Sequence, residues 1–174
     1  MADVQAHGGA GPCRFGGPVV AGVHPRQDPG ILACAAGLAA ALGVRLVCVY
    51  ADPSVFPETG AAGAVQLLPI DPDAADAGES GDAAASEGLD ADLQAGLAQA
   101  PVDWEFHRLW GSPEQALHRT AEELGASLIV VGTRADGPVH HLEERLAGSV
   151  ADHLLHHQKR PVVVVPAVVP PPVQ

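Results

Sequence analysis

Two short segments of the chain have the residue types that hold a phosphate group. Gly132, Thr133 and Arg134 follow an apolar run, and Gly148 with Ser149 begins an amphipathic segment. A helix that begins there has unpaired backbone N–H groups, and its dipole adds about half a positive charge. Glycine lets an anion approach the backbone, the Ser149 hydroxyl can donate a hydrogen bond, and Arg134 offers a compensating charge. The two segments therefore predict an anion site in the loop between them.

A purely structural interpretation accounts for the same residues. Gly132 can end a strand and Ser149 can cap a helix, and capping serines are far commoner than phosphate sites. Spacing alone does not separate the two interpretations, so both remain open at this point.

The elements that would position this loop follow from hydrophobic periodicity. Near-continuous apolar runs predict strands over residues 19–23, 44–50, 128–131 and 162–165, and an alternating pattern predicts a strand over 102–110. Apolar residues at helical spacing predict helices over 29–43, 86–99, 113–124 and 149–158. The stretch 51–70, rich in Pro and Gly, is expected to be a loop.

One helix start has a complete local signature. Ser112 stands at the expected N-cap, Pro113 at the first helical position and Gln115 at the third. Gly125 is expected to close this helix, and Gly43 is expected to close the first one.

Five apolar strands that alternate with four helices require a parallel sheet covered on both faces. The predicted fold class is therefore α/β, a Rossmann-like three-layer α/β/α sandwich with a five-stranded parallel sheet and right-handed crossovers. Ligands of such sheets lie outside the carboxyl ends of the strands, near the point where the strand order reverses. The loop from Gly132 to Gly148 belongs to that edge, as do the strand ends at His24, Asp52 and Trp110.

The charge of the chain argues against a nucleic-acid partner. The 174 residues carry a net charge of -12 with Lys159 as the one lysine, whereas nucleic-acid binding needs clustered Lys and Arg. No run approaches the ~20 apolar residues of a membrane span, and residues 1–17 lack the apolar core of a signal peptide. Three cysteines, without CxxC spacing, fit a reducing compartment, so a cytoplasmic location is expected.

One domain is expected over residues 18–166. Residues 1–17 are expected to be a disordered leader, and residues 167–174 a Pro-rich tail. The interval of about 52–85 is expected to be an acidic, flexible insertion, because Asp and Glu recur there among Ala and Gly with no Lys or Arg. Calcium binding by these acids is an alternative, but their spacing lacks the EF-hand pattern.

Three histidines, His153, His156 and His157, lie on one face of the last predicted helix. Metal sites use such spacing, but this face lies opposite Val150 and Leu154, so a solvated polar stripe explains it more simply and no metal site is predicted. The serines at helix starts are explained as caps and no G-x-S-x-G elbow is present, so no catalytic residue is predicted either.

Five segments together carry a family resemblance. They are Val-Ala-Gly-Val at 20–23, Gly-Ser-Pro at 111–113, Val-Val-Gly-Thr-Arg at 130–134, Gly-Ser-Val-Ala at 148–151 and Arg-Pro-Val-Val-Val-Val-Pro at 160–166. In this order they resemble the universal stress protein family in its actinobacterial style, over residues 18–166. The resemblance implies an adenine nucleotide alpha hydrolase-like fold, a stress-response role, homodimerisation through the last strand (Val162–Val165) and, in one branch, an ATP site.

The ATP-binding branch of that family has the pattern G-x2-G-x9-G-[S/T], which this chain matches in part. Gly132 and Gly148 with Ser149 fit its ends, while Ala135 stands at the middle glycine. The loop has fifteen residues between the outer glycines instead of twelve, and Gly137, displaced by two positions, is the expected substitute.

The resemblance also assigns contacts with a nucleotide. By analogy Val49 would contact the adenine, and Gly148, Ser149 and Val150 the phosphates. His24 ends the first strand, where the family usually has an aspartate that faces the nucleotide. The loop carries three acidic side chains, so a bound polyphosphate would need Mg²⁺.

Three functions are consistent with these residues. The first is regulatory binding of ATP or another adenine nucleotide in a stress response, which Gly148, Ser149 and Arg134 favour. The second is a nucleotide-free, dimeric interaction module of the same fold, which Ala135 and the longer loop favour. The third is slow ATP hydrolysis at the same site. The first is preferred.

Overall fold

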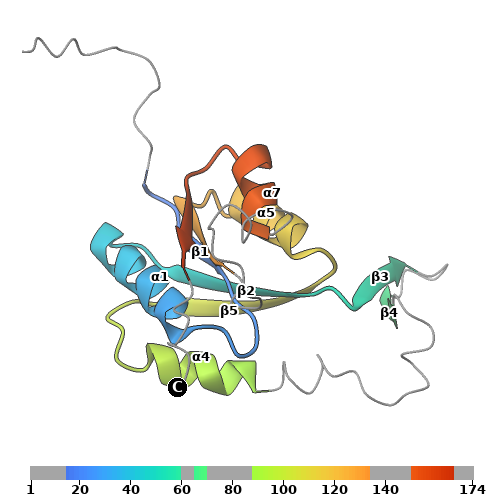
Figure 1. Ribbon diagram of the computed structural model, residues 1–174, viewed down its shortest axis with the longest axis horizontal. Helices are drawn as coiled ribbons and strands as arrows, with labels where there is room; N and C mark the ends of the chain where they lie inside the picture. Colours follow the sequence, from blue (N-terminus) through green and yellow to red (C-terminus); the bar gives the residue numbers. More distant parts are fainter. Residues whose placement is uncertain (1–14, 60–64, 70–87, 134–149, 167–174) are drawn as a thin grey trace, which may run out of the picture.

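The computed structural model describes residues 15–59, 65–69, 88–133 and 150–166. Five parallel strands form the central sheet in the order β5-β2-β1-β6-β7 (Figure 1). Their bounds are Val19–Gly22 for β1, Leu46–Asp52 for β2, Trp104–Trp110 for β5, Leu128–Gly132 for β6 and Val162–Val165 for β7. The predicted five-stranded parallel sheet is therefore confirmed.

The four helices that the structure describes cover both faces of this sheet. α1 (Pro29–Leu42) and α4 (Leu89–Leu97) lie on one face, and α5 (Pro113–Glu123) and α7 (Val150–His157) lie on the other (Figure 1). The arrangement is the predicted three-layer sandwich. None of these described helices is long and apolar enough to cross a bilayer.

Side chains of the central strands alternate between two hydrophobic clusters. In β2, Leu46, Cys48 and Tyr50 face α1 and α4, whereas Val47 and Val49 face α5 and α7. All five are buried. This is why the strand shows an unbroken apolar run in the sequence instead of an alternation of apolar and polar residues.

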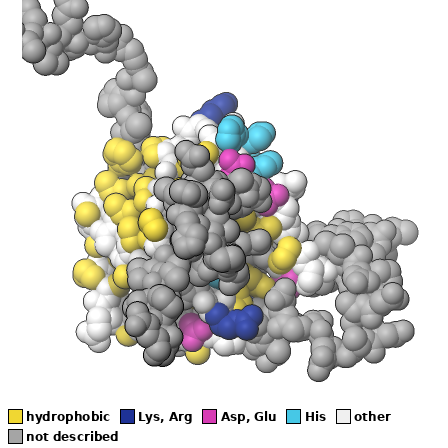
Figure 2. All heavy atoms as spheres, in the orientation of Figure 1, with side chains coloured by type: hydrophobic (Ala, Val, Ile, Leu, Met, Phe, Trp, Pro, Cys, Tyr) yellow, Lys and Arg dark blue, Asp and Glu magenta, His cyan; other side chains and the backbone are white. Residues whose placement is uncertain are grey.

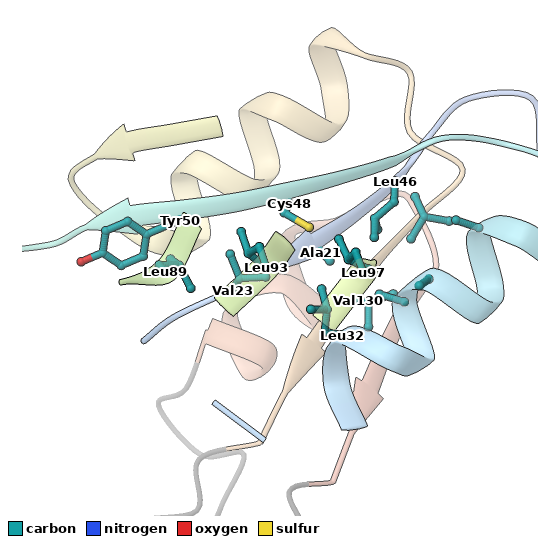
Figure 3. Packing of buried hydrophobic residues seen from close by; sticks show 14 of the residues in the cluster. Ala21, Val23, Leu32, Leu46, Cys48, Tyr50, Leu89, Leu93, Leu97 and Val130 are labelled. Atoms are coloured by element: carbon teal, nitrogen blue, oxygen red, sulfur yellow. The ribbon is translucent and has the colours of Figure 1, made fainter. Parts of the chain in front are cut away.

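α4 packs against the sheet through one row of leucines. Leu89, Leu93 and Leu97 are spaced four residues apart, and each is at most 3% exposed. They lie along β2 between Tyr50 and Leu46 (Figure 3). A helix of nine residues is marginal on its own in water, so this burial is what stabilises it.

Local signals begin and end the helices as the sequence predicts. The Ser112 Oγ accepts a hydrogen bond from the Gln115 N–H at 3.4 Å and caps α5. Gly43 and Gly125 follow the ends of α1 and α5 with φ of +65° and +59°. Glycine adopts this left-handed conformation without strain, which lets the chain turn back toward the sheet.

The structure differs from the prediction after β2, where the sequence predicts a loop over residues 51–70. β3 (Val55–Thr59) and β4 (Val65–Pro69) instead pair antiparallel as a separate two-stranded sheet, which extends beyond the end of β2 (Figure 1). Short strands that contain proline show no clear period, so the sequence did not indicate them. The predicted insertion beyond Pro69, most of the leader and all of the tail lie outside the described residues.

Candidate functional site

The strand order reverses between β1 and β6. β1 pairs with β2 on one side and with β6 on the other, so the sheet grows outward in both directions from this pair. α1 follows β1 on one face, and α7 follows β6 on the opposite face. The two connections therefore diverge at the ends of β1 and β6, and in open parallel sheets the ligand-binding crevice lies at such a point.

The carboxyl edge of the sheet is stepped at this point. Gly22, the last residue of β1, is in register with Val49, but β2 continues to Asp52, which is in register with Trp110 of β5. The three further residues of β2 extend the β2–β5 pair by about 10 Å past the end of β1. The ends of β1 and β6 therefore form the lower level of a step, and the last three residues of β2 with their partners in β5 form its wall.

Gly132, at the end of β6, has a packing role. A Cβ added there would lie 2.1 Å from the Cδ1 and 3.0 Å from the Cγ1 of Ile31. Ile31 is 2% exposed near the start of α1, so it has little room to move. Close contact between β6 and α1 thus requires glycine even without a bound anion. The sequence did not point to Ile31, because nothing local connects two residues so far apart in the chain.

His24 lies exposed in the turn between β1 and α1. Its backbone N–H donates to the Oε1 of Gln27 at 3.1 Å, and its Nδ1 donates to the Pro25 carbonyl at 2.9 Å. A carbonyl can only accept, so Nδ1 carries a proton and Nε2 is the ring atom that a ligand could reach. Arg26, with a φ of 62°, completes the turn in the left-handed region.

The amino end of α1 is occupied by its own acid. The Oδ1 of Asp28 accepts from the Gly30 N–H at 2.7 Å, and Pro29 follows at the start of the helix. A carboxylate at this end suits the helix dipole. A phosphate placed here would be repelled by Asp28, so α1 is a poor anion site although it borders the crevice.

The amino end of α5 is occupied in the same way. Partial burial raises the pKa of Glu114, but a hydrogen bond with Ser112, one with the Glu114 backbone and the proximity of His153 outweigh it, and the pKa falls below its ordinary value. The carboxylate therefore lies where an anion would bind. Ser112 acts as a helix cap, as the structural interpretation predicts.

Val49 is buried beside the step. It is 2% exposed within the cluster under α5 and α7, and its carbonyl accepts from the Val23 N–H at 2.9 Å. Val49 is in register with Gly22, so it lies at the base of the step, three residues before the end of β2.

The loop between β6 and α7 is described only at its two ends. Thr133 is buried, and its N–H donates to the Val165 carbonyl at 3.0 Å, which continues the pairing of β6 with β7 by one hydrogen bond. Val150 is the first residue of α7 and is half-buried. The other predicted contacts, Arg134, Gly137 and Gly148 with Ser149, lie outside the described residues.

Comparisons with known sequences identify a family over most of the chain. A sequence profile of the Universal stress protein family matches residues 18–166. No curated protein sequence gives a significant match.

Solved structures share the architecture. A protein of the universal stress protein family from Burkholderia pseudomallei is 28% identical, with a TM-score of 0.58, and the match covers 90% of this chain and 100% of that one. The universal stress protein from Archaeoglobus fulgidus in complex with dAMP is 18% identical, with a TM-score of 0.57 and coverage of 87% and 99%. A universal stress protein in complex with cAMP is 22% identical, with a TM-score of 0.56 and coverage of 87% and 98%.

Proposed function

The chain belongs to the universal stress protein family, and on this premise we propose that it binds an adenine nucleotide, ATP with Mg²⁺, as a regulatory ligand in a stress response. The observation that carries the proposal is the stepped edge where the strand order reverses and α7 begins. Two proteins of the same fold form complexes with dAMP and with cAMP, which favours an adenine nucleotide over other anions.

The step offers separate surfaces to the parts of a nucleotide. The base and ribose would lie next to Val49 and beyond the end of β1 at His24, against the last three residues of β2. The phosphates would bind residues 148–150, where α7 begins and follows β6 at the point where the strand order reverses. Arg134 would balance their charge, and Gly137 would leave room for them.

We also propose that two copies associate through β7. This strand lies at the edge of the described sheet, and its four valines are half-buried. The carbonyls of Pro161 and Val165 face β6, where each accepts a backbone N–H at 3.0 Å. By alternation, the N–H and C=O groups of Val162 and Val164 point away from the sheet. A second β7 strand, related by a two-fold axis, would pair with these groups and cover the valines.

A cytoplasmic location belongs to the same proposal. Cys34 and Cys48 are free thiols, as expected in a reducing compartment. Burial raises the pKa of Cys48 to about 12, so this thiol stays protonated and unreactive.

A nucleotide-free, dimeric interaction module of the same fold is the second candidate. The contact of Gly132 with Ile31 favours it, because this contact explains the strand-end glycine without a ligand. Ala135 at the middle position of the glycine pattern favours it as well.

Two measurements on the purified protein separate these candidates. One is mass spectrometry of any nucleotide that denaturation releases, and the other is an ATP titration with Mg²⁺ followed by Trp110 fluorescence. Trp110 is 39% exposed in the wall of the step, and a Trp104→Phe background lets it report alone. Released nucleotide or saturable binding supports the proposal. If no nucleotide is released and no binding is seen at millimolar ATP, the interaction module is the remaining candidate. Phosphate release over hours would show slow hydrolysis.

A charge substitution locates the phosphates. Gly148→Asp should abolish ATP binding, because its carboxylate would crowd and repel them. Gly37→Asp is the matched control: it adds the same charge on α1, where a Cβ meets no atom within 4 Å. Unchanged affinity in Gly148→Asp would mean that the phosphates bind elsewhere.

A further inference from the structure

A groove of about 380 Å³ opens between α5 and α7. Its lining includes Glu114, His118 and Arg119 of α5, and His153 and His157 of α7. Figure 2 shows histidine side chains gathered over this part of the molecule, next to acidic ones. The α7 histidines are exposed, as a solvated polar stripe would be, but the tertiary structure adds a groove with polar groups from a second helix.

His153 and His157 form a stacked pair one helical turn apart. Their ring centroids are 4.4 Å apart, and their planes are inclined by 10°. The Nδ1 of His157 lies 3.1 Å from the His153 carbonyl, which can only accept, so this nitrogen carries the proton and Nε2 is the nitrogen left to act as a ligand. Histidines that bind metals usually hold their other N–H in this way, which orients the ring.

The spacing of the two histidines, one helical turn apart, lets both reach one shared ion once their rings turn toward it. Two Zn–N bonds of about 2.1 Å at a tetrahedral angle place their nitrogens about 3.4 Å apart. In the stacked arrangement the ring planes are nearly parallel, with 4.4 Å between centroids, so the in-plane lone pairs do not meet at one point. Both side chains are exposed, and rotation about their side-chain bonds would bring the two Nε2 atoms onto one ion. Two histidines at positions i and i+4 of a helix are a recognised zinc-binding arrangement.

The remaining groups of the groove limit the number of protein ligands. His118 is held by Gln158 through Nδ1, and its Nε2 lies 3.7 Å from Glu122. Glu114 and Arg119 bring opposite charges, so the groove has little net charge of its own. Within the described part of the chain, no three His, Cys, Asp or Glu side chains converge on one point. The ion would therefore have two protein ligands, with water in the remaining positions.

His156 provides a matched control on the same helix. Its Nδ1 lies 2.8 Å from the Asp152 carbonyl, so it has the same tautomer as His157. The residue one turn before it is Asp152, whose carboxylate lies 3.6 Å away, instead of a second histidine. His156 thus shares the exposure and hydrogen bonding of the pair but not its geometry.

We propose that His153 and His157 chelate one divalent transition-metal ion, Zn²⁺, Ni²⁺ or Cu²⁺, through their Nε2 atoms. The site does not depend on the proposed nucleotide site. Bridging two successive turns stabilises α7, because the ion binds the helical arrangement of the two rings and not the unfolded one.

Calorimetric titration of tag-free protein with NiCl₂ and ZnCl₂, in a buffer that does not bind metals, tests this proposal. We expect one ion per chain, and binding at least about tenfold weaker in His153→Ala and in His157→Ala. His156→Ala should bind as the wild type does. The proposal is overturned if both variants of the pair bind normally. It is also overturned if binding is lost instead when His140 and His141, two adjacent histidines that precede α7 in the sequence, are both replaced by alanine.

Nuclear magnetic resonance of the unaltered protein makes the test independent of how the variants fold. Addition of Zn²⁺ should move the imidazole signals of His153 and His157 and leave those of His156 and His118 in place. Equal movement of all four, or of none, would overturn the proposal.

Discussion

The two outer strands of the sheet differ in the side chains that they present. β5 carries charged and polar side chains along its length. Glu105 forms an ion pair with Arg45 at 3.5 Å and lies 3.6 Å from the His107 ring, and Arg108 forms an ion pair with Asp90 at 3.5 Å. β7 consists of four half-buried valines. Both strands have only one described neighbour in the sheet, so the difference lies in the side chains and not in the topology.

This difference indicates which edge is suited to a partner. Charged side chains on an edge strand oppose pairing with another chain, whereas a bare apolar edge permits it. Exposed ion pairs contribute about 0–1 kcal/mol each to folding, so those on β5 matter more for preventing association than for stability. β7 is therefore the edge at which we expect a second copy. Four substitutions test this comparison, in decreasing order of their effect on the free energy of unfolding.

Val163→Pro should have the largest effect. The N–H of Val163 points toward β6, since the carbonyls of Pro161 and Val165 on the same side of the strand bond to that neighbour. Proline removes this donor inside the ladder and leaves its acceptor on β6 unpaired. The free energy of unfolding should therefore fall by about 3 kcal/mol, the upper end for a buried partner left without its hydrogen bond. Urea denaturation at fixed protein concentration measures the change. A loss below about 1 kcal/mol would show that β7 contributes little to the fold.

Gly132→Ala tests the packing at the end of β6, the strand next to β7, against α1. The new Cβ would overlap the Ile31 side chain, and such overpacking should destabilise the fold by about 1–3 kcal/mol. Adding Ile31→Val, which removes the Cδ1 atom, should restore part of this loss in thermal denaturation. Gly37→Ala is the control, because its Cβ meets no atom within 4 Å and alanine favours a helix. If Gly132→Ala is as stable as the unaltered protein, then the close contact with Ile31 does not require glycine at position 132.

Val164→Pro should separate association from folding. Its N–H points away from β6, so we expect less than about 1 kcal/mol of lost stability. The proposed dimer should nevertheless dissociate, because β7 loses a donor and gains a ring at the interface. Light scattering after gel filtration measures the mass. Arg108→Pro, at an outward-facing position of β5, should leave the dimer intact. A dimer that survives Val164→Pro would have its interface elsewhere.

Glu105→Ala should have the smallest effect on folding. It removes the partner of both Arg45 and His107, yet these exposed pairs are worth less than about 1 kcal/mol each. We expect association beyond the dimer in sedimentation velocity instead, because β5 loses part of its charged protection. A loss of several kcal/mol in stability without new association would show that the β5 charges stabilise the fold and do not prevent association.

The sequence predicted most of the secondary structure because the signals are local. Ser112 and Gly125 mark the ends of α5 by chemistry that acts within a few residues. The β3–β4 hairpin was missed because its short, proline-containing strands have no clear period. For the candidate site, the sequence predicted an edge of the sheet and a set of loop residues. Those loop residues, from Arg134 to Ser149, lie outside the described residues, so their positions stay a prediction.

The sequence by itself determined the fold class and the family, and it predicted the edge of the sheet at which a ligand would bind. Periodicity and capping depend on neighbours in the chain, so they can be read along it. Only the tertiary structure decided the step between β1 and β2, the contact of Ile31 with Gly132, and the groove that joins α5 to the histidines of α7. Each of these brings together residues far apart in the chain, and their proximity depends on strand order and packing, which no local pattern records.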